Sequence, residues 1–210
     1  TEVANVFSYL ESANKTEKSR FQFSHLLVGQ FNLRTDLIHK IEREIAHAQQ
    51  GLPASMILKM NSLEDREMIE KLYEASAAGV KIQVITRGIC CLVAGVEGIS
   101  ENIKVTSIVD RFLEHARVFM FANNGNEEIY LSSADWMNRN MMRRVEIAWP
   151  IIDPKHRMRI LQECCQVYLD DNFDAWLLQA DGSYQLAADM MVNKANLFSA
   201  QQHLMQKYTD

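Results

Sequence analysis

Proline, glycine and long apolar runs are scarce in this chain. Its 210 residues include 3 prolines and 8 glycines, while 48% of the residues are hydrophobic. This composition excludes collagen-like and low-complexity proteins, and its apolar fraction can offset the conformational entropy that keeps polar chains disordered. No apolar stretch approaches the roughly 18 residues that span a bilayer. We therefore expect one soluble globular domain with a sizeable core.

Cysteine is also sparse, and its arrangement argues against both metal binding and disulfides. The four cysteines form two adjacent pairs, Cys90-Cys91 and Cys164-Cys165, without the CxxC spacing of zinc sites. Disulfides between neighbouring cysteines are strained, so we predict free thiols, no metal site and a cytoplasmic location. The formal net charge of -5 argues against a general nucleic-acid binder. Because the chain opens on Thr1-Glu2-Val3 without a leader, we interpret it as a fragment.

Apolar periodicity alternates between strand-like and helix-like segments. Helical spacing predicts helices over residues 35–49, from the capping-box pair Ser62 and Asp65 to Gly79, from Pro154 to Leu169, and over residues 196–207. Short β-branched runs predict strands over residues 23–28, 55–60, 80–86, 103–109, 117–121, 129–131 and 145–151. The alternation of strand and helix favours an α/β fold with a mixed, largely parallel sheet flanked by helices.

Polar residues gather where these strands are expected to end, which is where α/β proteins bind ligands. Arg87 follows the third strand, and His115 and Arg117 alternate along another, so both side chains face one way. Ser132 and Ser133 end a strand and are expected to open a helical turn, where hydroxyls and unpaired N–H groups favour phosphate. Three arginines follow: Arg139, Arg143 and Arg144. The sequence therefore predicts a phosphate-binding site.

The order His115-x-Arg117 and then Ser132-Ser133-Ala134-Asp135 resembles one half of the phospholipase D superfamily signature, His-x-Lys with Gly-Ser-x-Asn. Longer segments resemble the last catalytic domain of long-chain polyphosphate kinase: residues 58–63, 87–92, 98–103, 107–117 and 131–137. The resemblance runs from about residue 21 to residue 154 and fades afterwards. It identifies residues 21–210 as a carboxy-terminal phospholipase D-like catalytic half-domain and residues 1–20 as a linker or the end of a preceding domain.

The resemblance implies reversible transfer of the terminal phosphoryl group of ATP to inorganic polyphosphate through a phosphohistidine. That histidine belongs to an upstream half, so the isolated fragment is expected to be inactive. Arg87 and Arg144 resemble phosphate-contacting arginines, His115 resembles the second-site histidine, and Ser133 is a candidate for phosphate contact or helix capping. Arg117 replaces the superfamily lysine and is assigned with His115 to catalysis, since its planar fork suits phosphate oxygens.

Several further positions allow two readings. Asp135 replaces the superfamily asparagine, and we expect it to orient Arg117 or to cap the following helix. Lys59 is a candidate for phosphate contact and Trp136 for stacking on adenine, with burial in the core as the alternative for Trp136. Residues after Asn172 carry no functional signal.

The resemblance also implies the ligands and partners. ATP or ADP and polyphosphate are the expected substrates, and Mg²⁺ is expected with the nucleotide, its protein ligands lying in the absent portion. The family implies a homo-oligomer, contact with upstream domains of the same polypeptide, at most peripheral association with the inner membrane face, and no nucleic acid. Two alternatives stay open: a phospholipase D-like phosphodiesterase, which cleaves a chromogenic diester, and a non-catalytic polyanion-binding module.

Overall fold

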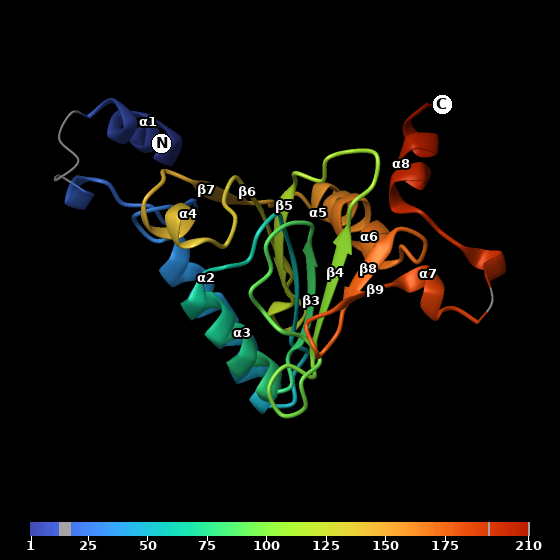
Figure 1. Ribbon diagram of the computed structural model, residues 1–210. Helices are drawn as coiled ribbons and strands as arrows, with labels where there is room; N and C mark the ends of the chain where they lie inside the picture. The colour runs from blue at the N-terminus through green and yellow to red at the C-terminus, as the bar shows by residue number, and fades with distance from the viewer. Residues whose placement is uncertain (13–17, 193, 210) are drawn as a thin grey trace.

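A single mixed sheet runs through the computed structural model, which describes residues 1–12, 18–192 and 194–209 (Figure 1). In these residues nine strands lie in the order β1-β7-β6-β5-β2-β3-β4-β8-β9. The strands are β1 (Leu27–Val28), β2 (Ser55–Met60), β3 (Lys81–Thr86), β4 (Ile103–Ile108), β5 (Arg117–Phe121), β6 (Glu128–Ser132), β7 (Ile147–Pro150), β8 (Ala175–Leu178) and β9 (Tyr184–Leu186). The expected mixed α/β fold is confirmed.

Helices cover both faces of this sheet. They are α1 (Glu2–Glu11), η1 (Lys18–Arg20), α2 (Leu33–Gln49), α3 (Arg66–Ala77), η2 (Asn123–Gly125), α4 (Asn138–Met142), α5 (Pro154–Ile160), the π-helical η3 (Leu161–Gln166), α6 (Val167–Leu169), α7 (Ala187–Met190), η4 (Lys194–Asn196) and α8 (Ala200–Thr209). Helices α2 and α3 pack on one face, and α5, α6 and α8 lie on the other side (Figure 1). Among the helices of the described residues, none combines the length and the hydropathy that a membrane-spanning helix needs.

Three local expectations need correction. The first strand covers only Leu27–Val28 instead of beginning at residue 23, and α8 begins at Ala200 instead of residue 196. The N-cap of α3 is Asp65, whose carboxylate accepts the N–H of Met68, so Ser62 does not begin this helix. The helix that begins at Pro154 is as predicted, with Asp153 as its N-cap.

The strand directions also differ from the expectation. Pairs β2–β3 and β3–β4 are parallel, whereas the other pairs between neighbouring strands of the described sheet are antiparallel, so the sheet is not largely parallel. The crossover through α3 permits a parallel pair, whereas the short connection between β5 and β6 permits only a hairpin. The periodicity of each segment does not encode which neighbour it pairs with, so counting strands and helices overestimated the parallel fraction.

Successive side chains of the central strands enter two different cores. Leu58 of β2 and Phe119 of β5 pack toward α2 and α3, while Ile57 and Val118 pack toward the α5–α8 side. Burying each large apolar side chain contributes about 1.5–3 kcal/mol, and a one-residue slip would exchange the two sets. Burial on both faces therefore fixes the register of β2 and β5. The register in turn fixes where the ends of these strands lie along the edge of the sheet.

This register brings several strand ends to one edge of the sheet. Because β2, β3 and β4 run in parallel, their carboxyl ends lie together, and the antiparallel partners place the start of β5 and the end of β6 at the same edge. The loops beyond the strands stay in contact, since Leu63 N donates to Ile89 O at 2.8 Å and Trp136 N donates to Ser62 O at 3.1 Å. We call this border of the sheet the carboxyl edge.

Candidate phosphate-binding site

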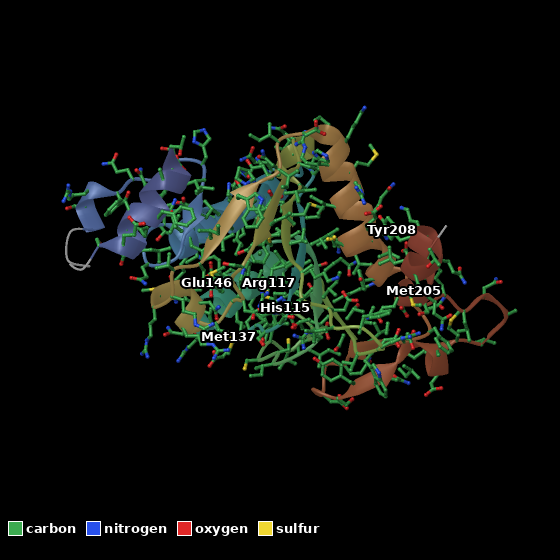
Figure 2. The ribbon with its side chains drawn as sticks, turned by 90° about the horizontal axis from the view of Figure 1, so that it is seen from above. His115, Arg117, Met137, Glu146, Met205 and Tyr208 are labelled. Atoms are coloured by element: carbon green, nitrogen blue, oxygen red, sulfur yellow. The ribbon has the colours of Figure 1, made fainter. Side chains whose placement is uncertain are left out.

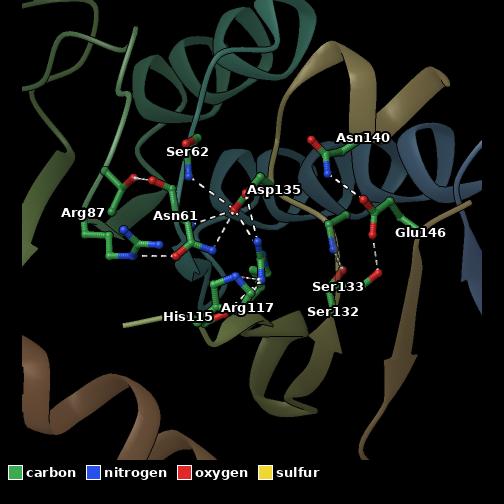
Figure 3. A network of polar contacts seen from close by, with 12 residues as sticks. Asn61, Ser62, Arg87, His115, Arg117, Ser132, Ser133, Asp135, Asn140 and Glu146 are labelled. Carbon is green, nitrogen blue, oxygen red and sulfur yellow. Dashed lines mark hydrogen bonds and ion pairs between the residues drawn. The ribbon is translucent and has the colours of Figure 1, made fainter. Parts of the chain in front are cut away.

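Asp135 lies at the centre of the polar contacts at the carboxyl edge (Figure 3). It is 7% exposed, and its Oδ1 accepts the backbone N–H of Asn61 at 2.7 Å and of Ser62 at 3.3 Å. Burial alone raises the pKa of Asp135, but the Arg117 guanidinium and these N–H groups outweigh it and hold the pKa below its ordinary value. Asp135 is therefore an ionised anchor that joins the segment after β6 to the end of β2.

Arg117 connects this anchor to the exposed His115. Its Nε donates to Asp135 Oδ1 at 3.2 Å and its Nη2 to Oδ2 at 3.1 Å, a two-pronged ion pair. Its Nη1 lies 3.1 Å from Nδ1 and 3.3 Å from Nε2 of His115, whose ring lies beside Arg117 in Figures 2 and 3. Arg117 Nη1 also donates to the backbone oxygen of His115 at 3.0 Å, so Arg117 holds both the ring and the backbone of this residue. Asp135 orients Arg117 as predicted and does not cap α4, whose N-cap is Met137.

Arg87 reaches the same centre from the end of β3. Its Nε donates to Asn61 Oδ1 at 2.8 Å and to the backbone oxygen of Glu114 at 2.6 Å. Asn61 in turn donates from Nδ2 to Asp135 Oδ1 at 3.3 Å, so it bridges Arg87 and Asp135. Within the described residues the terminal nitrogens of Arg87 make no hydrogen bond. An arginine held by Nε presents those terminal donors to an anion.

Ser133 turns toward β7 instead of beginning a helix. Its hydroxyl donates to the buried Glu146 carboxylate and accepts the N–H of Ile147 at 3.1 Å, and its own N–H donates to Ile147 O at 3.0 Å. Asn140 Nδ2 donates to the other Glu146 oxygen at 2.7 Å. The expectation that Ser133 opens or caps a helix is wrong, because the backbone pairs with β7 for one residue more than the sequence pattern indicates.

Three arginines on α4 and the following loop are exposed: Arg139, Arg143 and Arg144. The Arg144 side chain is 58% exposed, and its Nη1 lies 4.0 Å from Glu146 Oε1. Within the described parts of the chain, no hydrogen bond or ion pair joins Arg144 to Arg87, His115 or Arg117. The structure thus brings Arg87, His115 and Arg117 together and leaves Arg144 on a neighbouring loop.

Lys59 is buried beneath the site. It is 2% exposed, its Nζ donates to Glu114 Oε2 at 2.9 Å, and Nζ lies 3.3 Å from the centre of the Tyr168 ring. Because Glu114 pairs with the ammonium charge, Lys59 holds the residue that precedes His115 instead of facing solvent.

Trp136 and the cysteines belong to the core or its margins. Trp136 is fully buried, and its ring centre lies 5.4 Å from that of Phe119, so neither face is open to adenine. All four cysteines are free thiols, as predicted. Burial raises the pKa of Cys165 to about 12, which keeps this thiol protonated at neutral pH.

Residues 26–201 match the family described as polyphosphate kinase C-terminal domain 2. The chain belongs to this family. Polyphosphate kinases from Xylella fastidiosa strain Temecula1 and Pseudomonas aeruginosa strain PAO1 are 51% and 47% identical to it over 160 and 180 residues. These alignments cover 76% and 86% of this chain, but the chain spans only 23% and 25% of the length of those relatives.

A solved structure supports the family assignment of this polyphosphate kinase domain. The crystal structure of polyphosphate kinase from Porphyromonas gingivalis matches 99% of this chain and 31% of its own, at 37% identity with a TM-score of 0.89. A phospholipase D family member from Salmonella typhimurium matches 73% of this chain at 14% identity with a TM-score of 0.49, which is too low to support an inference. The family match extends to residue 201, well beyond residue 154 where the sequence resemblance was expected to fade.

Sequence reasoning missed three side chains that shape the site of this polyphosphate kinase domain. Asn61 follows β2 as Arg87 follows β3, so its position at a strand end was a usable signal. Glu146 and Gln201 carried no such signal. Gln201 contacts Glu114 across 87 residues of sequence, a separation that no local pattern bridges.

Proposed function

We propose that this chain is the carboxy-terminal domain of a polyphosphate kinase and supplies one cationic half of a site that transfers a phosphoryl group between ATP and inorganic polyphosphate. The observation that carries the proposal is the meeting of Arg87, His115 and Arg117 at the carboxyl edge of a chain in this family. Donors held in advance by protein contacts stabilise transferred charge without reorganising during the reaction.

Arg87 is the strongest candidate for contact with the nucleotide phosphates, because Asn61 and Glu114 hold its Nε and leave the terminal nitrogens available. Arg117 has a narrower role. Its Nε and Nη2 donate to Asp135, and its Nη1 donates to His115. Arg117 therefore positions the histidine and adds positive charge nearby. Arg144, exposed on a neighbouring loop, is a further candidate for phosphate contact. Ser133 must release Glu146 before it can donate to phosphate.

The reaction we propose proceeds in two displacements. A histidine from the upstream half attacks the γ-phosphorus of ATP, the bond to the β-phosphate oxygen breaks, and ADP leaves. A terminal oxygen of polyphosphate then takes the phosphoryl group from that histidine. ADP is a weakly basic leaving group, so His115 need not protonate it. His115 instead joins the arginines in binding the equatorial oxygens, where charge accumulates in such transition states.

The carboxylates at the carboxyl edge are already paired with protein donors. Asp135 accepts from Asn61, Ser62 and Arg117, and Glu146 accepts from Asn140 and Ser133. In the described parts of the chain, no cluster of three His, Cys, Asp or Glu side chains could hold a metal ion. These contacts fit a half-site that binds phosphate oxygens. That Mg²⁺ enters bound to ATP, with its protein ligands in the upstream half, stays a prediction from the family. Upstream domains, self-association, a cytoplasmic location and peripheral membrane contact remain predictions from the family.

The first prediction tests His115 in a full-length polyphosphate kinase that contains this chain. His115→Ala should lower kcat for ATP-dependent polyphosphate synthesis by about 100-fold or more, the usual loss when one preorganised donor is removed. His39→Ala is the matched control, because His39 is an exposed histidine on α2 with a side chain 65% exposed, and it should retain the normal rate.

Two results would contradict the proposal. A His115→Ala enzyme that polymerises phosphate at a near-normal rate would remove the histidine from the site. Cleavage of a chromogenic phosphodiester by the unaltered enzyme, lost in His115→Ala, would favour the phosphodiesterase alternative instead.

A further inference from the structure

The loop that carries His115 lacks apolar anchors of its own. It spans residues 109–116 between β4 and β5 and contains no helix or strand. Its three large apolar side chains face solvent, with Val109 68%, Phe112 48% and Leu113 70% exposed. Packing therefore does little to fix this loop, and polar contacts must determine its position.

Glu114 supplies those contacts on one side. Its carboxylate accepts from Lys59 Nζ at 2.9 Å, from the Tyr168 hydroxyl at 2.9 Å and from Gln201 Nε2 at 2.8 Å. Its backbone oxygen accepts from Arg87 Nε at 2.6 Å. Burial, and then the neighbouring Glu114 charge, raise the pKa of Tyr168 far above its ordinary value, so the hydroxyl keeps the proton that it donates. Glu114 thus links β2, α6 and α8 to Arg87, and it also fixes the position of the adjacent His115.

Gln201 supplies the contacts on the other side. Its Oε1 accepts the N–H of Phe112 at 2.8 Å, and its Nε2 donates to Phe112 O at 2.8 Å, so one amide pairs with the backbone as a neighbouring strand would. Gln201 is 4% exposed and lies at the second position of α8. The preceding N–H, of Ala200, donates to Asp171 Oδ2 at 2.7 Å, which fixes the start of the helix.

We propose that Gln201 and Tyr168 are positioning residues for phosphoryl transfer, because their contacts with Glu114 and Phe112 hold His115 and Arg87 in place. The inference rests on the proposed function of the site. It assigns a role to the carboxy-terminal segment after residue 172, in which the sequence shows no functional signal. Neither residue needs to touch substrate, since misplacing a reacting group by about 1 Å costs up to about 100-fold in rate.

The second prediction concerns Gln201→Met in the full-length kinase. Methionine keeps the length and volume of the side chain but cannot pair with Phe112 or Glu114, so kcat for polyphosphate synthesis should fall at least about tenfold. Gln202→Met is the matched control, since Gln202 is exposed in the same turn, and should have no effect. Rates are measured well below the melting temperature of each variant. Tyr168→Phe, which keeps the ring on Lys59 and loses only the hydroxyl, should show a smaller loss of about two- to fivefold.

A double-mutant cycle separates positioning from general stability. If Gln201 acts through the loop, most of its effect disappears once His115 is alanine, and Gln201→Met then changes kcat by less than about twofold. Two results would overturn this inference: a normal kcat in Gln201→Met, or a double variant whose loss of kcat equals the product of the two single losses. In either case a slow His115→Ala enzyme would still support the proposed function. A fully active His115→Ala enzyme would overturn the proposed function itself and this inference with it.

Discussion

Asp135 shows at the scale of one residue how a buried charge can organise a site without facing the ligand. Its two oxygens accept from a guanidinium and from two backbone N–H groups that belong to another loop. The Asp135 carboxylate adds a negative charge to the carboxyl edge, and the charge of Arg117 offsets it at 3.1 Å. The pair works as a unit, so either residue alone would leave a buried ion without its partner.

The third prediction is that Asp135→Asn lowers the free energy of unfolding at pH 7 by about 2 kcal/mol, the usual value for a hydrogen bond to a charged group. The folded-state pKa of Asp135 lies below its ordinary 3.8, so the ion pair stabilises the fold above that value. The difference between the two proteins should therefore shrink as the pH falls through 3.8 toward the folded-state pKa. Urea unfolding across this pH range measures it, and a difference independent of pH would contradict the assignment.

At the scale of elements, β1 and the segment after it hold the loop that carries Arg144. Gly29 N donates to Glu146 O at 2.7 Å, and Gln30 Nε2 donates to Arg143 O at 2.7 Å. Tyr9 of α1, 1% exposed, donates from its hydroxyl to Gln30 Oε1 at 2.9 Å. Helix α1 is therefore tied to the body of the described chain. Whether residues 1–20 also end a preceding domain stays a prediction.

The fourth prediction follows from the close approach at Gly29. A Cβ added there would lie 2.6 Å from Arg144 O and 3.0 Å from Glu146 N, both backbone atoms that cannot rotate away. Gly29→Ala should therefore destabilise the protein by about 1–3 kcal/mol, as overpacking does, and displace the Arg144 loop. Urea unfolding measures the loss of stability. A rise in the KM for polyphosphate would report the displacement of the Arg144 loop. An unchanged unfolding midpoint would contradict this prediction, because it would show that the Arg144 loop can move away from the added Cβ without loss of stability.

For the molecule as a whole, the proposed function requires an acidic chain to bind a polyanion. The formal net charge is -5, so the overall field repels polyphosphate and the local arginines have to outweigh it. Exposed charges interact over a screening length of about 8 Å at physiological salt. Attraction to polyphosphate should therefore be local and sensitive to salt.

The fifth prediction is that the KM for polyphosphate in the full-length kinase rises as NaCl increases from about 0.05 M to about 0.3 M. In the combined Arg87→Ala, Arg144→Ala enzyme this rise should be much smaller, because the charges that produce it are gone. The combined Lys81→Ala, Arg159→Ala enzyme is the control, since the exposed Lys81 begins β3 at the opposite edge of the sheet and the exposed Arg159 pairs with Glu163. Equal salt dependence in all three enzymes would place the polyphosphate path elsewhere.

Local signals predicted most of the elements and the centre of the candidate site. Apolar periodicity located α2, α3 and the central strands, and strand-end positions located Arg87, His115 and Arg117. The sequence could not predict the antiparallel majority of the sheet, because pairing partners are chosen by packing between distant segments. It also misjudged Ser133, where the backbone pairs with β7 instead of starting a helix.

Residue order alone is enough to establish the family, the positions of the central strands and of α2 and α3, and which residue types stand at the strand ends. Each of these depends on residue order or on neighbours a few positions apart, which the sequence states directly. Residue order does not show that Lys59 is buried against Glu114, that Asp135 anchors two loops, or that Gln201 holds the loop beside His115. Those contacts join residues 55, 74 and 89 positions apart, and such pairings arise only when the sheet and both helical layers have assembled.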